Sequence, residues 1–351
     1  MSKPVTRESS FELIRLIAML MIVTYHIYMH HICQDYPSAF NRAIQIPLHI
    51  GVPLFVLISG YWGIRVSGKG LARLLCYLAV YSIPILLIYS SLEGTWGGGK
   101  NAIKPLFFVS KSPFWFVRTY LCLYLFSPVI NAFLETITLK RRIYLLLILG
   151  FMAVYMGSIG VDPAIRDGKN ILYFLFVYVV GNTLRIYGYL WRRVPTRFFV
   201  EAFLLLNVVL VAGACLFDGT LIQKAIHRLS FPYNSPIMQV NALLFFLIIA
   251  KQSFKSSSVN WLASSALAIY LIHESSLVEN YFLSPVSLQI RALVGNDYLT
   301  FFAIVALAGA VCLACILIDK LLGPIWKIAA RAGEWTEYKV RQAWMEWRLP
   351  S

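Results

Sequence analysis

The sequence is poor in charge. Only 13% of its 351 residues are Asp, Glu, Lys or Arg, whereas a soluble domain has about 25%. Acidic residues are the scarcer kind, 16 against 31 basic ones. Hydrophobic residues make up 59% of the chain and the mean hydropathy is +0.70. This composition excludes an ordinary cytosolic enzyme.

The chain also lacks the patterns of a metal, redox or nucleic-acid site. Five of its six cysteines fall in apolar runs and are interpreted as small apolar residues. Cys312 and Cys315 form C-x-x-C, but no cationic neighbour would stabilise a thiolate there. The net charge of +15 is shared among short loops instead of gathering on one segment. We therefore predict no metal and no nucleic-acid partner.

Long apolar runs are what the chain does have. A run of roughly 20 residues crosses the ~30 Å hydrocarbon core as a helix. Ten such runs occur, at 11–29, 47–64, 71–91, 114–133, 142–160, 170–187, 199–216, 236–251, 261–280 and 300–319. The predicted fold is all-α, a polytopic transmembrane bundle of ten helices.

Basic residues predict the orientation. With a cytosolic N-terminus, 20 Lys and Arg fall in inner segments and 9 in outer loops, which favours both termini in the cytosol. Residues 1–320 are predicted to form the membrane domain. Residues 321–351 are predicted to be a cytosolic, basic, Trp-rich tail that lies on the membrane surface, because Val340, Trp344 and Trp347 share one helix face.

The first helix contains Arg15 and His26, eleven residues apart. At ~100° and 1.5 Å per residue they share a face and lie about 16 Å apart along the axis. An Arg at the centre of a span costs at least ~2.5 kcal/mol in free energy of membrane insertion, so it usually faces the protein interior or a water-filled cavity. Glu12 lies one turn before Arg15 and is placed to pair with it. The alternatives are a snorkelling Arg15 and a core histidine at 26.

Three other predicted helices contain polar or aromatic groups. Ser59, Tyr61 and Arg65 lie at the cytosolic end of the second helix, at the depth of Arg15. Trp115 and Tyr120 begin the fourth helix on the outer side, near the depth of His26, where an aromatic belt is the alternative.

The ninth predicted helix places His273 and Glu274 past its midpoint toward the outside. Adjacent residues on a helix point ~100° apart, so we expect no dyad between these two residues. A partner that orients His273 would then come from another helix.

Four ordered blocks resemble the acyltransferase 3 family of integral-membrane O-acyltransferases, and within it the capsular and exopolysaccharide (xanthan-type) branch. The blocks are Glu12-Leu-Ile-Arg15 with His26 eleven residues after the Arg, Val52-Pro-Leu-Phe55 through Ser59-Gly60-Tyr61, Trp115-Phe116 with Tyr124 and Pro128, and Tyr270-Leu-Ile-His273.

The resemblance implies a multi-pass protein of the bacterial cytoplasmic (inner) membrane. The expected co-substrate is an acyl-CoA, namely acetyl-CoA. No permanently bound cofactor is expected. The acceptor is a hydroxyl of a surface or exopolysaccharide sugar, such as a lipid-linked oligosaccharide repeat. The expected acyl-CoA-binding residues are Arg15, Ser59, Tyr61 and Arg65. The expected catalytic residue is His26, supported by Glu12, Trp115, Tyr120 and His273.

Imidazole suits proton removal from a sugar hydroxyl near pH 7, which favours His26 as a general base. A transient acyl-histidine is the alternative. Ser59 and Tyr120 are candidate oxyanion donors only if they approach His26. Outside the enzyme class, the rival interpretations are a secondary transporter or flippase of lipid-linked oligosaccharide and a partner-binding membrane protein.

Overall fold

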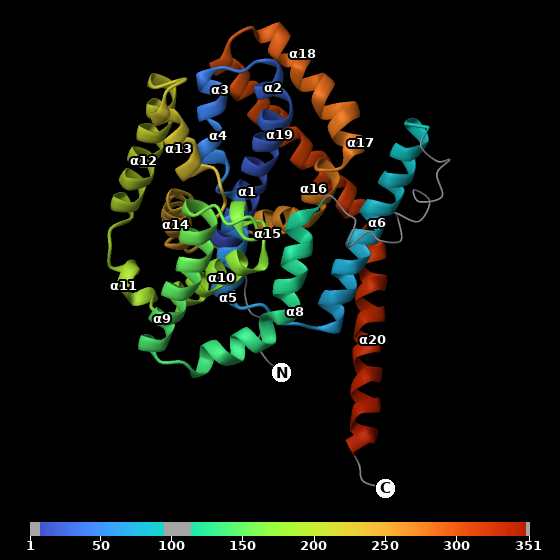
Figure 1. Cartoon of the computed structure of the whole chain (residues 1–351). Helices are drawn as coiled ribbons and strands as arrows, with labels where there is room; N and C mark the ends of the chain where they lie inside the picture. Colours follow the sequence, from blue (N-terminus) through green and yellow to red (C-terminus); the bar gives the residue numbers. More distant parts are fainter. Residues whose placement is uncertain (1–7, 95–113, 349–351) are drawn as a thin grey trace.

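The computed structural model describes residues 8–94 and 114–348, with side chains to residue 343, and every regular element in them is a helix. The all-α class is therefore confirmed, and Figure 1 shows the helices packed as one bundle.

The first elements are α1 (Ser9–Ile27), the π-helical turn η1 (Tyr28–Ile32), α2 (Cys33–Asp35), α3 (Ala39–Ala43), α4 (Gln45–Leu48), α5 (Gly51–Trp62), α6 (Gly68–Leu92), α8 (Trp115–Thr136), α9 (Leu139–Gly150) and the π-helix η4 (Phe151–Ile159). The next are the 3₁₀ turn η5 (Arg166–Gly168), α10 (Ile171–Ile186), α11 (Gly188–Arg192), α12 (Thr196–Leu216), α13 (Leu221–Ser230), α14 (Pro236–Ala250), α15 (Ser257–Ala263) and α16 (Ala266–His273). The last are α17 (Ser276–Val278), the π-helical turn η6 (Glu279–Leu283), α18 (Ser284–Val294), α19 (Asp297–Leu321) and α20 (Gly323–Arg348).

Each predicted apolar run falls on a helical segment, but the segments differ in length. Among the described residues, seven helices are long and apolar enough to cross a membrane. A bent pair, Ser257–His273 with Ser276–Val294, makes an eighth if it is one span. Two further apolar helices, Ile171–Ile186 and Pro236–Ala250, are shorter. Ten crossings with cytosolic termini therefore stay a prediction.

The first two spans form the centre of the bundle. In the spans Ser9–Asp35 and Ala39–Trp62, 61% and 78% of the most apolar window is buried inside the protein, against 17% in α12. The polar groups of α1 therefore face protein on most sides. This burial explains how a helix with an Arg and a His is accommodated.

Close backbone contact sets the rotation of α5. A Cβ at Gly60 would lie 2.1 Å from the carbonyl oxygen of Tyr178 on α10, and one at Gly181 would lie 2.4 Å from that of Leu57. Only glycine permits this approach, as helix packing in membranes commonly requires. Because successive residues on a helix point ~100° apart, Ser59 and Tyr61 then face different sides of α5.

The outer helices expose large apolar side chains. On α12 the exposed fractions of Leu205 and Val208 are 66% and 63%, and Val129 on α8 and Leu147 on α9 are exposed to a similar degree. Apolar surface of this extent is unusual on a soluble monomer and fits contact with lipid. These helices therefore present apolar faces suited to contact with lipid.

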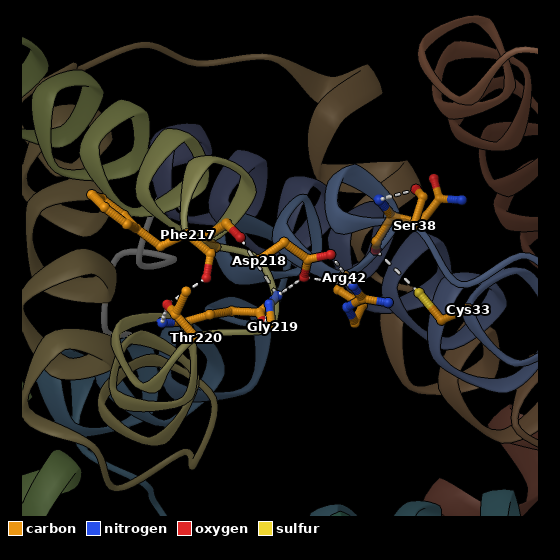
Figure 2. Close-up of polar contacts among 10 residues, drawn as sticks. Cys33, Ser38, Arg42, Phe217, Asp218, Gly219 and Thr220 are labelled. Carbon is orange, nitrogen blue, oxygen red and sulfur yellow. Dashed lines mark hydrogen bonds and ion pairs between the residues drawn. The ribbon is translucent and has the colours of Figure 1, made fainter.

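A polar clamp fixes the segment that follows α1. Arg42 on α3 donates from Nη2 to both carboxylate oxygens of Asp218, at 2.6 and 2.9 Å, as Figure 2 shows. The Arg42 guanidinium holds the pKa of the Asp218 carboxyl below its usual range. Cys33 donates to the carbonyl of Asn41 (3.1 Å), and Ser38 caps α3 (Figure 2). These bonds attach the end of the first span to the loop after α12.

The predicted tail is one long helix. α20 runs beside α6 and then extends beyond the bundle (Figure 1). Trp326 is buried, whereas Trp335 and Val340 are exposed. The side chains of Trp344 and Trp347 lie outside the described residues. Cytosolic location and membrane-surface contact of residues 321–351 stay predictions.

The predicted orientation leads to one direct test. A reporter fused after Lys69, in the first turn of α6, and one fused after Gly219, beyond α12, are expected on opposite faces of the membrane. Alkaline phosphatase should be active only at Gly219 and a fluorescent protein only at Lys69. If both fusions report the same face, the assignment of inner and outer loops is wrong.

Candidate functional site

A cavity of about 450 Å³ lies among α1, α5, α6, α8 and the α15–α16 segment. Arg15, Met19 and Ile22 line it from α1, at the i, i+4, i+7 spacing of one helix face. The predicted face of α1 that contains Arg15 therefore lines a cavity.

Helix α1 and the α15–α16 segment form two sides of the cavity and run in the same direction. The start of α1 contacts the start of α15, since Ser9 donates to Asn260 (2.9 Å), and the end of α1 contacts the end of α16. The cavity therefore begins at the end with Arg15 and reaches Ile22 and Tyr270 at its other end.

A polar cluster lies one turn beyond Ile22 and Tyr270. The Nδ1 atom of His26 lies 3.0 Å from Nε2 of His273 and directly contacts the Glu274 carboxylate. The same carboxylate lies 3.8 Å from Nε2 of His273. His273 is buried, and the side chain of His26 is 13% exposed. These three groups, which we call the His26 cluster, come from α1 and the end of α16.

A helix break explains the position of Glu274. The prediction of one continuous helix over 261–280 is wrong, because α16 ends at His273 and the chain bends by 68° before the next helical segment. Ser275 is extended and caps the following turn with its side chain. Glu274 lies in this break, so its carboxylate reaches His26 on α1. His273 also contacts His26, which is the expected partner from another helix.

Hydrogen bonding defines the tautomer of His26. Nδ1 of His273 lies 2.6 Å from the carbonyl oxygen of Ile269, which can only accept, so in the neutral ring this nitrogen carries the hydrogen and Nε2 is an acceptor. Nδ1 of His26 then faces two acceptors, His273 Nε2 and the Glu274 carboxylate, and must itself be the donor. The Nε2 atom of neutral His26 is left with a free lone pair.

Arg15 and Glu12 form the expected ion pair. Nη1 of Arg15 lies 2.5 Å from Oε1 of Glu12, and both side chains line the cavity. The Arg15 side chain is 30% exposed, whereas that of Glu12 is buried. Arg15 can therefore contact a ligand in the cavity while Glu12 holds one side of the guanidinium.

Ser59 and Tyr120 lie at the Arg15 end. Ser59 Oγ donates to the carbonyl of Phe55 (2.8 Å) and lies 3.0 Å from the Tyr120 hydroxyl, and both residues line the cavity. The predicted depth of Tyr120, near His26, is wrong, because its hydroxyl lies beside Ser59 at the Arg15 end. Neither hydroxyl contacts His26, so neither meets the condition set for an oxyanion donor.

Tyr61 and Arg65 do not line this cavity. Tyr61 is buried on the other side of α5, against the rings of Phe11 (4.8 Å) and Phe246 (5.7 Å). The packing at Gly60 explains this, since it turns Tyr61 away from Ser59. Helix α5 ends at Trp62, so Arg65 lies in an exposed segment beyond it. The structure does not bring either residue to Arg15 as predicted.

Arg73 is the cation that sequence reasoning missed. It lies on α6 and lines the cavity together with Arg15. Its position within the first turn of the predicted span 71–91 was the available signal. Trp115 packs beside Tyr233 (5.2 Å) and under Lys169, outside the cavity lining.

The His26 cluster is also the one group of potential metal ligands among residues 8–94 and 114–348. One donor atom from each of its residues lies within 4.8 Å of the others. The direct contact between Nδ1 of His26 and the Glu274 carboxylate is that of a hydrogen bond, whereas a Zn²⁺ ion would separate its ligand atoms by bonds of about 2.0–2.2 Å to each. The geometry favours proton chemistry here.

The fold and the site define a helical membrane protein with a cavity that begins at an Arg and ends one helical turn before a largely buried His–carboxylate cluster. Over residues 8–319 the chain matches the family model described as an acyltransferase domain, and it belongs to the acyltransferase 3 family. Comparison with curated proteins and with solved structures found no match. The chain is therefore a multi-pass membrane acyltransferase.

Proposed function

We propose that this acyltransferase moves an acetyl group from acetyl-CoA to a sugar hydroxyl of a bacterial surface or exopolysaccharide, in the inner membrane. The observation that supports it most is the cavity that Arg15 lines and that ends at Ile22 and Tyr270, one helical turn before the His26 cluster. A cation such as Arg15 suits the phosphates of the donor. The capsular and xanthan-type acceptor rests on the motif resemblance alone.

In the proposed reaction His26 is the general base. Its free Nε2 takes the proton of the sugar hydroxyl while the oxygen attacks the thioester carbonyl. The tetrahedral intermediate then expels the coenzyme A thiolate, which receives that proton from His26. Glu274 stabilises the imidazolium in between, because its carboxylate contacts Nδ1. The alternative, an acetyl group carried on Nε2, uses the same atom.

Tyr270 is the hydroxyl we assign to the developing oxyanion. It lines the cavity one helical turn before His273, and its ring centroid lies 6.0 Å from that of His273. The side chain is buried, and its hydroxyl has no hydrogen-bond acceptor among the described residues. Such a donor suits a transition-state charge better than Ser59, whose hydrogen is bound to Phe55.

Acetyl-CoA labelled in the acetyl group tests the proposal. Purified protein in nanodiscs is expected to release coenzyme A and to label a lipid-linked oligosaccharide acceptor. Translocation of the acceptor without acetyl transfer would favour the transporter instead. If the label is transferred to a non-carbohydrate acceptor alone, the acceptor class is wrong while the donor stands.

Arg15→Ala is expected to weaken acetyl-CoA binding by about 1.5–3 kcal/mol, the range for a hydrogen bond to a charged group. The partly exposed guanidinium contributes little to packing, but Glu12 loses its ion-pair partner, so binding is compared only in variant protein that is shown to be inserted and folded. Arg185→Ala is a control, since Arg185 binds backbone carbonyls at Tyr61 and Trp62 outside the cavity. Unchanged affinity in Arg15→Ala would make Arg15 a structural residue.

A further inference from the structure

A second cavity, of about 500 Å³, adjoins the first. It lies among α6, the end of α19 and the start of α20. Arg73 and Ser264 line both cavities, so the two meet at the Arg15 end of the first. A ligand that fills the first cavity and emerges at this end would enter the second.

The second cavity is strongly basic. Its cations come from three helices: Lys69 and Arg73 on α6, Lys320 on α19, and Lys327 and Arg331 on α20. Only Lys69 has an ion-pair partner among the described residues, Glu334 at 2.8 Å.

The cavity has fewer carboxylates than cations, two against five. Asp319 is buried and accepts hydrogen bonds from Tyr81 (3.1 Å) and Ser265 (2.6 Å). Lys327 and Arg331 are exposed, and Lys320 is half-buried. The cavity therefore presents an excess of positive charge to a ligand.

Helix α20 is held firmly against α6. A Cβ at Gly333 would lie 2.4 Å from the carbonyl oxygen of Gly68, so the two backbones touch. Glu337 accepts a hydrogen bond from the amide of Gly68 (2.7 Å). Trp326 stacks on Tyr77 with ring centroids 3.9 Å apart. These contacts fix the helix turns that hold Lys327 and Arg331.

We propose that this second cavity binds the phosphorylated nucleotide end of coenzyme A, with Lys320, Lys327 and Arg331 contacting its phosphates. The inference rests on the proposed donor. The pantetheine arm would pass Arg73 and Ser264 into the first cavity toward His26. The family match ends at residue 319, so these three cations lie beyond the acyltransferase domain. In this chain the C-terminal helix thus completes the donor site.

The double variant Lys327→Gln/Arg331→Gln tests the inference in the full chain. Its KM for acetyl-CoA is expected to rise roughly tenfold at low salt, because two phosphate contacts are lost, and the increase should shrink at high salt. Turnover of acetyl-pantetheine, which has the arm but no phosphate, should match that of the unchanged protein. Inhibition by adenosine 3′,5′-diphosphate should weaken by a similar factor.

Lys140→Gln/Lys339→Gln is the charge-matched control, since both lysines are exposed and neither lines the cavity. An unchanged KM for acetyl-CoA in the cavity variant would overturn the inference. The inference would also be overturned if the cavity variant lost activity only in vesicles with anionic lipid, because the cavity would then bind lipid headgroups. If the unchanged protein transfers acetyl from acetyl-pantetheine but not from acetyl-CoA, the proposed donor itself is wrong.

Discussion

Replacement of His26 by glutamine is expected to lower acetyl transfer by roughly 10²- to 10⁴-fold, the contribution typical of a general base. An amide can keep a hydrogen bond to Glu274 or His273, but it cannot take a proton from the acceptor hydroxyl. His26→Ala should lose as much, and His273→Ala should lose less. The measurement is the transfer rate of membrane-inserted protein at saturating acetyl-CoA.

His30→Gln is the matched control for this variant. His30 lies one turn further along the same segment, in the π-helical turn η1, and faces Glu279 at 3.4 Å. It should retain transfer, because it is outside the His26 cluster. Near-normal transfer by His26→Gln at normal expression would make His26 a structural residue and refute the mechanism.

The central pair of polar residues was predictable because it lies on one helix. Regular geometry over eleven residues requires Arg15 and His26 to share a face, and Glu12 lies one turn before Arg15. The composition of the runs likewise predicts helices, since a backbone in lipid must satisfy its own hydrogen bonds. Periodicity within a helix can thus predict both the all-α class and the polar face of α1.

Features that depend on contacts between helices were not predictable in the same way. The depth of Tyr120 depends on how α8 places its hydroxyl beside Ser59, and the direction of Tyr61 depends on the contact between Gly60 and Tyr178. Arg73 joins Arg15 only through the packing of α6. Hydropathy contains no information on these crossings.

The break at Glu274 shows a second kind of limit. Residues 261–280 are apolar enough for one span, yet the helix ends at His273. The serines at 275 and 276 were the available signal, because a serine can cap a new turn with its side chain. A straight helix would have separated the side chains of His273 and Glu274, whereas the break directs both to His26.

Glu274→Gln is expected to reduce turnover strongly, within the roughly 10²- to 10⁴-fold range for loss of general-base function. The carboxylate accepts the hydrogen of His26 Nδ1, and a glutamine amide that turns its NH₂ toward Nδ1 would favour the other tautomer, with the hydrogen on Nε2. His26 would then face the acceptor hydroxyl as a donor and could not remove its proton.

The kinetic pattern separates this positioning role from a purely structural one. Because Glu274 lies beyond the Tyr270 end of the cavity, Glu274→Gln should lower kcat and leave the KM for acetyl-CoA unchanged, whereas Arg15→Ala should raise KM. Glu279→Gln, one turn further along the chain beside His30, is the control and should change neither value. Equal kcat in Glu274→Gln and the unchanged protein would show that His26 needs no carboxylate to set its tautomer, and the assignment of Nε2 as the base would fail.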